Sequence, residues 1–154
     1  MPDHILEFRL LLQAPRARVF EFFARPENLA TLTPGWLGFT LLTPPPIVLA
    51  AGAVLDYRIR WLGLPFRWRS LIREYDPPYR FVDVQVIGPY ARWEHRHMFV
   101  EEAGGTVMED RVTYRLPLGP IGELVHRLGV RRQLEAIFAY RRDRLRSLLA
   151  GGAP

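Results

Sequence analysis

Two histidines stand at positions where an alternating strand would bury them. In the segment Arg92–Val100, the odd positions Trp93, His95, His97 and Phe99 are aromatic, whereas most even positions are charged. Period-2 alternation indicates a half-buried β-strand, so both imidazoles are expected to face the interior. Buried polar groups are costly unless they are hydrogen-bonded or hydrated. The pattern therefore favours a cavity with a polar wall over a dry core.

An aspartate belongs to the same expected interior. The next predicted strand, Thr106–Leu116, places Asp110 on its apolar face together with Tyr114. Asp110 is a candidate general base, and its alternative role is a hydrogen bond that fixes strand pairing. Burial would raise the pKa of Asp110, and a neighbouring imidazolium would lower it. We favour the hydrogen-bonding role and commit no residue to catalysis, with His95, His97 and Asp110 as the candidates.

A His-x-His pair on one face of a strand can also hold a transition metal. Asp110 or Asp83 could add a third ligand, but no further ligand follows at a fixed spacing. We therefore predict no metal and no cofactor, and interpret His95 and His97 as cavity lining, with plain core histidines as the alternative. The chain has no cysteine, which excludes thiolate catalysis, and no catalytic-serine, phosphate-loop or dinucleotide motif occurs.

Asp83 and Gln85 lie on one face of the predicted strand Phe81–Ile87, and valines form the other face. The inward face depends on the register across the following turn, because a slip of one residue inverts a strand. We favour the register that pairs Asp83 with His95 and Gln85 with Trp93, since it gives these polar groups partners. The register with the valines inward stays open.

Other inward positions carry aromatic rings with polar atoms. Such rings can stack on a planar ligand and donate hydrogen bonds to it, or they can form ordinary aromatic core. The predicted cavity wall comprises Tyr57, Trp61, Trp68, Ser70, Asp83, Gln85, Trp93, His95, His97, Asp110, Tyr114 and Phe138.

The elements that must position these residues form an α+β pattern. In chain order they are a strand, two short helices, six strands and a long helix: His4–Leu12, Pro15–Ala24, Glu27–Leu32, Trp36–Leu42, Val54–Leu62, Phe66–Tyr75, Phe81–Ile87, Arg92–Val100, Thr106–Leu116 and Pro120–Leu149. Consecutive strands with short turns predict an antiparallel sheet, and the last helix must cover its concave face. A curved sheet grips a helix over only part of its length, so the remaining space becomes a pocket.

The last helix is expected to be amphipathic, and Gly129 is expected to kink it or split it in two. Its predicted buried stripe is Leu124, Leu128, Leu134, Ile137, Phe138, Leu145 and Leu148.

Composition limits the class of protein. The 154 residues fit one domain, residues 1–149, with a flexible tail at 150–154. The net charge is +5, all basic residues are arginine, and they are scattered along many elements. We interpret the arginines as solvated surface and predict no nucleic-acid partner. The absence of a signal peptide and of an apolar run near 20 residues predicts a cytoplasmic protein without integral membrane association.

The order of elements resembles the helix-grip fold of the START and polyketide-cyclase superfamily (SRPBCC), and the resemblance covers the whole chain. Ala14-Pro15 with Val19-Phe20 is similar to the usual start of the superfamily's first helix. The stretch from Arg80 to Phe99, with its Gly88-Pro89-Tyr90 turn, resembles a bacterial subgroup. Similar domains accompany an epimerase-like domain in proteins labelled cell-division inhibitor. The resemblance implies a curved seven-stranded antiparallel sheet wrapped on a long C-terminal helix.

The resemblance also implies a small hydrophobic or amphipathic ligand, such as a lipid, quinone, polyketide or sterol-like molecule. A cyclase, dehydratase or hydrolase that uses a His/Asp pair in the same cavity is the alternative. A structural or regulatory domain with a vestigial cavity is the third possibility. The apolar segment Ile47–Leu49 is interpreted as a lip of the cavity, a contact of a homodimer or a short buried strand.

Overall fold

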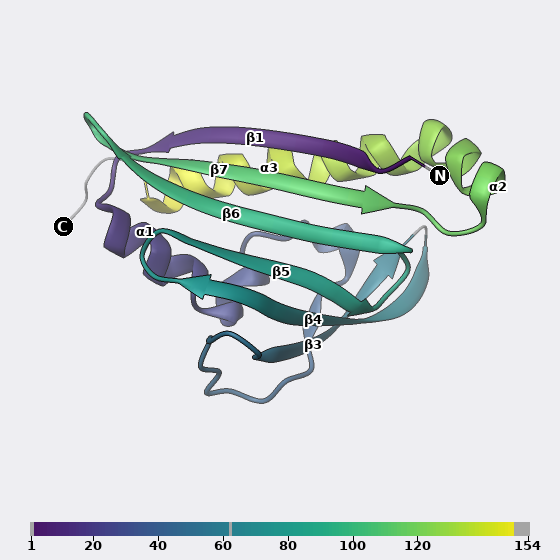
Figure 1. Ribbon diagram of the computed structural model, residues 1–154, viewed down its shortest axis with the longest axis horizontal. Helices are drawn as coiled ribbons and strands as arrows, with labels where there is room; N and C mark the ends of the chain where they lie inside the picture. The colour runs from purple at the N-terminus through teal and green to yellow at the C-terminus, as the bar shows by residue number, and fades with distance from the viewer. Residues whose placement is uncertain (1, 62, 150–154) are drawn as a thin grey trace.

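A curved, fully antiparallel sheet wraps around one face of the C-terminal helix (Figure 1). The computed structural model describes residues 2–61 and 63–149, so the predicted tail at 150–154 and position 62 lie outside the described residues. The seven strands are ordered β1-β7-β6-β5-β4-β3-β2, which confirms the predicted α+β helix-grip class. They are β1 (His4–Leu12), β2 (Thr40–Leu41), β3 (Val54–Trp61), β4 (Leu64–Asp76), β5 (Arg80–Ile87), β6 (Arg92–Glu102) and β7 (Gly105–Arg115).

Short helical segments connect β1 to β2. They are α1 (Arg16–Phe23), η1 (Pro26–Leu29) and η2 (Gly35–Leu37). The prediction of a strand over Trp36–Leu42 was wrong for most of its length, because Pro34 starts a 3₁₀ turn and Gly38 ends it in the left-handed region at φ 61°. Only two residues remain for β2.

The C-terminal rod contains α2 (Gly119–Val125), a π-helical turn η3 (His126–Val130) and α3 (Arg131–Leu149). Gly129 lies in the π turn, which takes the place of the expected kink or split. A π turn holds more residues per turn than an α-helix. The positions buried around it accordingly recur every four residues, at Gly122, His126, Val130, Leu134 and Phe138.

The predicted buried stripe was therefore partly wrong. Leu124 and Leu128 are 56% and 74% exposed, and Leu148 is 39% exposed. Leu134, Phe138 and Leu145 are buried as predicted. For Leu124 and Leu128 the error follows from the π turn, which changes the spacing between these positions and the buried positions of α3.

Bulges bend the sheet around the rod. The long strand β4 carries register shifts between Arg69 and Ser70 and again between Ile72 and Glu74. A bulge bends its strand and increases the local twist, so the sheet curls toward α3.

The segment Ile47–Leu49, between β2 and β3, lies in a loop and not in the short strand that was one alternative. Val48 is exposed there, whereas Leu49 turns inward and is buried.

The apolar interior has two main parts. Leu10, Phe20, Phe99 and Leu145 belong to the cluster that joins α1 to the sheet. The second cluster joins α3 to the other half of the sheet and includes Trp68. Among the residues that the structure describes, no helix combines the length and the apolar character needed to cross a lipid bilayer.

Candidate functional site

A cavity of about 150 Å³ lies between the concave face of the sheet and the helix α3. Strands β3 to β6 supply most of its aromatic wall, and α3 supplies the opposite side. The segments between β1 and β3 close it with Phe23, Leu29, Leu37 and Leu49.

The structure places most of the predicted wall residues around this cavity. Those that line it are Tyr57, Trp61, Trp68, Ser70, Asp83, Trp93, His95, His97 and Phe138. Gln85, Asp110 and Tyr114 lie outside its wall and contact other groups. The prediction that these three side chains line the cavity was therefore wrong, because each is held by hydrogen bonds to other groups.

Gln85 is held by the turn that follows its strand. Its side-chain nitrogen donates to the carbonyl of Tyr90 at 2.7 Å, and its oxygen accepts from the Tyr90 amide at 3.0 Å. These two bonds close the turn between β5 and β6 and take Gln85 away from the cavity. Tyr90 itself lines the cavity instead.

The favoured register of β5 places Asp83 directly opposite His95, as predicted. Asp83 accepts a hydrogen bond from Nε2 of His97 at 2.9 Å. The same pairing buries Phe81, whose ring stacks on His97 with centroids 4.1 Å apart. The alternative register with the valines facing the cavity is therefore wrong, although Val82 is itself buried.

Asp110 lies behind the two histidines, and together they form a buried polar chain. His95 Nε2 is 3.0 Å from Asp110 Oδ1, and His97 Nδ1 is 3.2 Å from the same oxygen. The latter contact is close enough for an ion pair but lies off the line of a good hydrogen bond. The imidazole rings stack at 3.7 Å, and both histidines and Asp110 are 5% exposed or less.

The protonation states follow from this arrangement. Burial alone would raise the pKa of Asp110, but the positive charge of the adjacent histidine pair and the hydrogen bond with His95 outweigh burial and lower it. Burial would lower the pKa of His97, but the flanking carboxylates of Asp110 and Asp83 outweigh burial and raise it. Burial and the positive charge of His97 lower the pKa of His95. His97 is therefore the ring that holds its second proton more strongly, and His95 is the ring that loses it first.

The neutral state of His95 also fixes the position of its proton. A neutral imidazole that faces a carboxylate through Nε2 must carry its proton there, so it donates to Asp110. Its Nδ1 then keeps a lone pair that can accept a proton or a hydrogen bond. The arrangement is that of a histidine base oriented by a buried carboxylate.

Several aromatic residues of the wall form hydrogen bonds with one another or with Ser70. The indole of Trp68 donates to Ser70 Oγ at 3.0 Å, and the Tyr57 hydroxyl lies 3.3 Å from the same oxygen. The indole of Trp61 donates to the Tyr90 hydroxyl at 3.2 Å. These bonds leave the ring faces and edges as the surface available to a ligand.

Two polar residues of α3 complete the wall, and sequence reasoning missed both. Gln133 and Arg141 line the cavity. Gln133 Oε1, Arg141 Nε and Arg141 Nη1 are buried and have no hydrogen-bond partner among the described residues. The guanidinium of Arg141 lies 5.3 Å from the centre of the Phe138 ring and lowers the pKa of Asp83.

Arg141 had been included with the solvated arginines, and this interpretation was wrong. The available signal was its position three residues after Phe138, which places both on neighbouring parts of one helix face. Buried unpartnered donors are rare in folded proteins, so this guanidinium marks the polar end of the cavity.

Asp83, His95 and His97 each offer one atom within 4.8 Å of the others, which is a spacing compatible with a metal ion. The raised pKa of His97 opposes a metal here, because a metal must compete with the proton for the nitrogen lone pair. The absence of a metal from the cavity stays a prediction.

Residues 12–138 match the family described as polyketide cyclase/dehydrase and lipid transport. The chain belongs to this family. No curated protein sequence is matched by the chain at a significant level.

Solved structures share the fold. TTHA0849 from Thermus thermophilus has 20% identity and a TM-score of 0.68, over 95% of this chain and 98% of that one. The di-domain ARO/CYC StfQ from the steffimycin biosynthetic pathway has 16% identity and a TM-score of 0.72, over 96% of this chain and 50% of that one. A nucleoside-diphosphate sugar epimerase from Corynebacterium glutamicum has 26% identity and a TM-score of 0.63. The match covers 91% of this chain but 28% of the epimerase chain, as expected from the resemblance to epimerase-fused domains.

Proposed function

We propose that this protein binds a small amphipathic molecule in the cavity, with an aromatic or apolar body and an oxygen-bearing end. The observation that carries the proposal lies beside an aromatic wall: Gln133 Oε1, Arg141 Nε and Arg141 Nη1 are buried without a hydrogen-bond partner among residues 2–61 and 63–149. A buried donor without a partner costs about 1–3 kcal/mol, and more when it is charged. A ligand oxygen at this point would accept from the Arg141 donors and remove that cost, and a ligand hydroxyl could also donate to Gln133 Oε1.

The size of the cavity limits the part of the ligand that is enclosed. An engineered cavity of about 150 Å³ in another protein accepts benzene, and typical ligand pockets measure about 300–1,000 Å³. The cavity of about 150 Å³ therefore suits one ring or the end of a chain. A larger polyketide, quinone or lipid would extend past Leu29 and Leu49 or require α3 to shift.

Apolar contact alone would bind such a group weakly. Burying about 150 Å² of ligand surface contributes about 4 kcal/mol, and the loss of translational freedom offsets most of it. A hydrogen bond to a charged group adds about 1.5–3 kcal/mol. The polar end at Arg141 thus decides the affinity and the orientation of the ligand.

The dyad of His95 and Asp110 supports a second candidate function, that of a cyclase, dehydratase or hydrolase. The neutral imidazole of His95 keeps a lone pair while the buried carboxylate orients the ring, which is the arrangement of a general base. For turnover, His95→Gln would abolish the reaction with little change in ligand affinity. For binding alone, the same variant would change affinity modestly, and no substrate would be consumed.

The binding proposal is tested with two probes of matching size, benzoate and toluene, by quenching of tryptophan fluorescence. Trp61, Trp68 and Trp93 line the cavity and report occupancy. We expect Arg141→Met to weaken benzoate by about 10- to 150-fold, the value of one charge-assisted hydrogen bond, and to leave toluene nearly unchanged.

The matched control is Arg142→Met, since Arg142 is the next residue and its side chain is half-exposed. The control should bind both probes like the unmodified protein. Failure of both probes to quench the tryptophans, or equal losses in the two variants, would refute the proposed site.

A further inference from the structure

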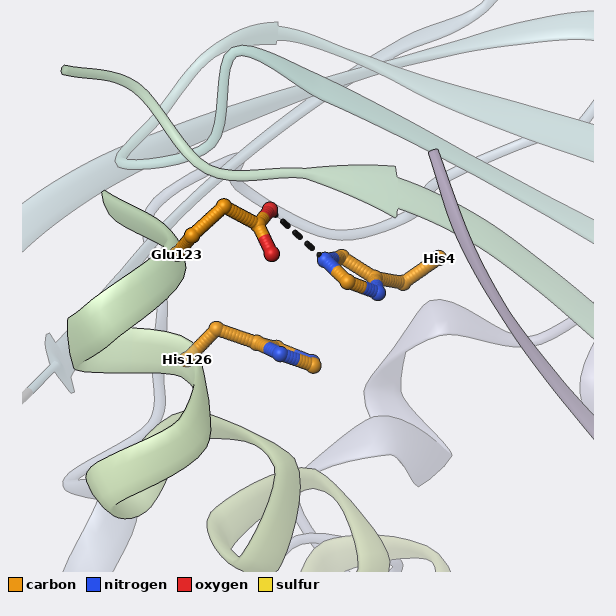
Figure 2. A group of neighbouring side chains, drawn as sticks. All are labelled: His4, Glu123 and His126. Carbon is orange, nitrogen blue, oxygen red and sulfur yellow. Dashed lines mark hydrogen bonds and ion pairs between the residues drawn. The ribbon is translucent and has the colours of Figure 1, made fainter. Parts of the chain in front are cut away.

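A second cluster of ligand-type side chains lies at the α2 end of the rod (Figure 1), outside the cavity wall (Figure 2). It contains His4 at the start of β1, Glu123 on α2 and His126 at the start of η3. His4 Nε2 and Glu123 Oε1 are 2.9 Å apart, and the two imidazole rings stack with centroids 3.7 Å apart. The proposed ligand cavity makes no use of these residues.

The fold brings the three together through two independent constraints. Glu123 and His126 are three residues apart in the helical rod, so their side chains share one face; Glu-x-x-His pairs at this spacing are metal ligands in helical bundles. Gly122 lets α2 approach the end of β7, because a Cβ there would lie 2.1 Å from the Pro117 carbonyl. Strand β1 then supplies His4 from across the sheet edge.

Tyr114 fixes the orientation of one ring. Its hydroxyl lies 2.7 Å from His126 Nε2, and Tyr114 is fully buried opposite His4 in the β1–β7 pairing. Metal-binding histidines usually have their second nitrogen held by such a partner. The bond leaves Nδ1 of His126 for another contact.

The donor set suits a transition metal. One nitrogen of each imidazole and one carboxylate oxygen all lie within 4.8 Å of one another. In a tetrahedral zinc site these atoms would be about 3.3 Å apart, so small side-chain rotations suffice. The side chains of His4 and Glu123 are 19% and 21% exposed, which gives a metal and a water molecule access.

We propose that His4, Glu123 and His126 form a three-ligand site for Zn²⁺, with water in the fourth position. Zinc binding needs the ionised form of Glu123 and the neutral form of both imidazoles, so it is expected to displace the proton shared by His4 and Glu123.

The surroundings set the expected strength. Burial lowers the pKa of His126, and the positive charges of Arg131 and Arg127 lower it further, so these arginines oppose a cation at this position. Binding is therefore expected to be weaker than in a closed site with four protein ligands. The competing interpretation is a polar clip between β1 and α2, which predicts no saturable binding.

The experiment titrates ZnCl₂ into the untagged, metal-free protein by calorimetry and repeats the titration with Co²⁺ under visible absorption. We expect one equivalent to bind and Co²⁺ to give the intense bands of tetrahedral coordination. Glu123→Gln and His4→Gln should each weaken binding by at least about 100-fold, and Tyr114→Phe by about 10-fold.

Two controls locate the metal. Glu21→Gln removes an exposed carboxylate of α1 that pairs with Arg25, and it should bind zinc normally. Asp83→Asn disables the other possible cluster and should also bind normally. No saturable binding, or a loss in Asp83→Asn instead of Glu123→Gln, would overturn the proposal, and circular dichroism shows that each variant is folded.

Discussion

Replacing Asp110 by asparagine removes the charge on which the buried histidine chain depends. Asp110 is 3% exposed and contacts His95 at 3.0 Å and His97 at 3.2 Å. The asparagine has nearly the same shape, so the change isolates charge from packing. In this variant, Asp83 is the one carboxylate that still contacts His97 among the described residues. The pKa of His97 is therefore expected to fall.

The size of the effect follows from the cost of breaking a buried pair. Removing one partner of such a pair costs about 3–5 kcal/mol, because the remaining charge loses its compensation. For a domain of this size, an m-value of about 2 kcal/mol/M turns a loss of about 4 kcal/mol into a shift of about 2 M in the urea midpoint. The melting temperature should fall by about 8–16 °C.

The assay is urea unfolding at neutral pH, followed by tryptophan fluorescence and circular dichroism. Glu109→Gln is the matched control, because Glu109 is the preceding residue on β7 and its ion pair with Arg9 lies at the exposed surface. That control should cost at most about 1 kcal/mol. If Asp110→Asn costs no more than Glu109→Gln, the reasoning about the buried chain is wrong.

The remaining predictions concern pH and one turn. Because the folded protein raises the pKa of His97, its stabilising contribution is present below about pH 6.5 and is lost as the pH rises through the folded value. The difference in unfolding free energy between the unmodified protein and His97→Gln should accordingly shrink from pH 6 to pH 9; a constant difference would contradict it. Gly105→Ala should lower the melting temperature by more than Gly52→Ala. Both glycines have positive φ, but only at Gly105 would the added Cβ lie 2.0 Å from the Leu12 carbonyl oxygen. Equal losses would show that the turn accommodates the methyl group.

The inward position of the histidines could be predicted because it depends on local period alone. In β6 the buried positions include His95, His97 and Phe99, which are the odd positions of the alternating pattern. The pairing of Asp83 with His95 needed one more principle, that buried polar groups find partners. Both are properties of neighbouring strands, which short turns hold in register.

Features that depend on distant packing could not be predicted in the same way. Gln85 satisfies its polar atoms within its own turn, a choice that the alternation of the strand does not reveal. Gly129 marked an interruption of the last helix, but it did not show that the interruption would be a π turn, which changes the rotation of α3 relative to α2. The contact of Tyr114 with His126 joins β7 to the rod, and it depends on how the rod crosses the sheet.

The same distinction explains which histidines were noticed. His95 and His97 lie two residues apart, so their common face is visible from the sequence. His4 and His126 come together only through the pairing of β1 with β7 and the return of α2. Sequence separation conceals such a cluster unless the fold is known.

The most direct test is native mass spectrometry of the protein purified from its native host. We predict a small molecule bound in stoichiometric amount, released on denaturation, with an oxygen-bearing end. It should be retained by Arg142→Met and depleted in Arg141→Met. A bare polypeptide mass for all three proteins would contradict the claim that the cavity exists to hold a ligand.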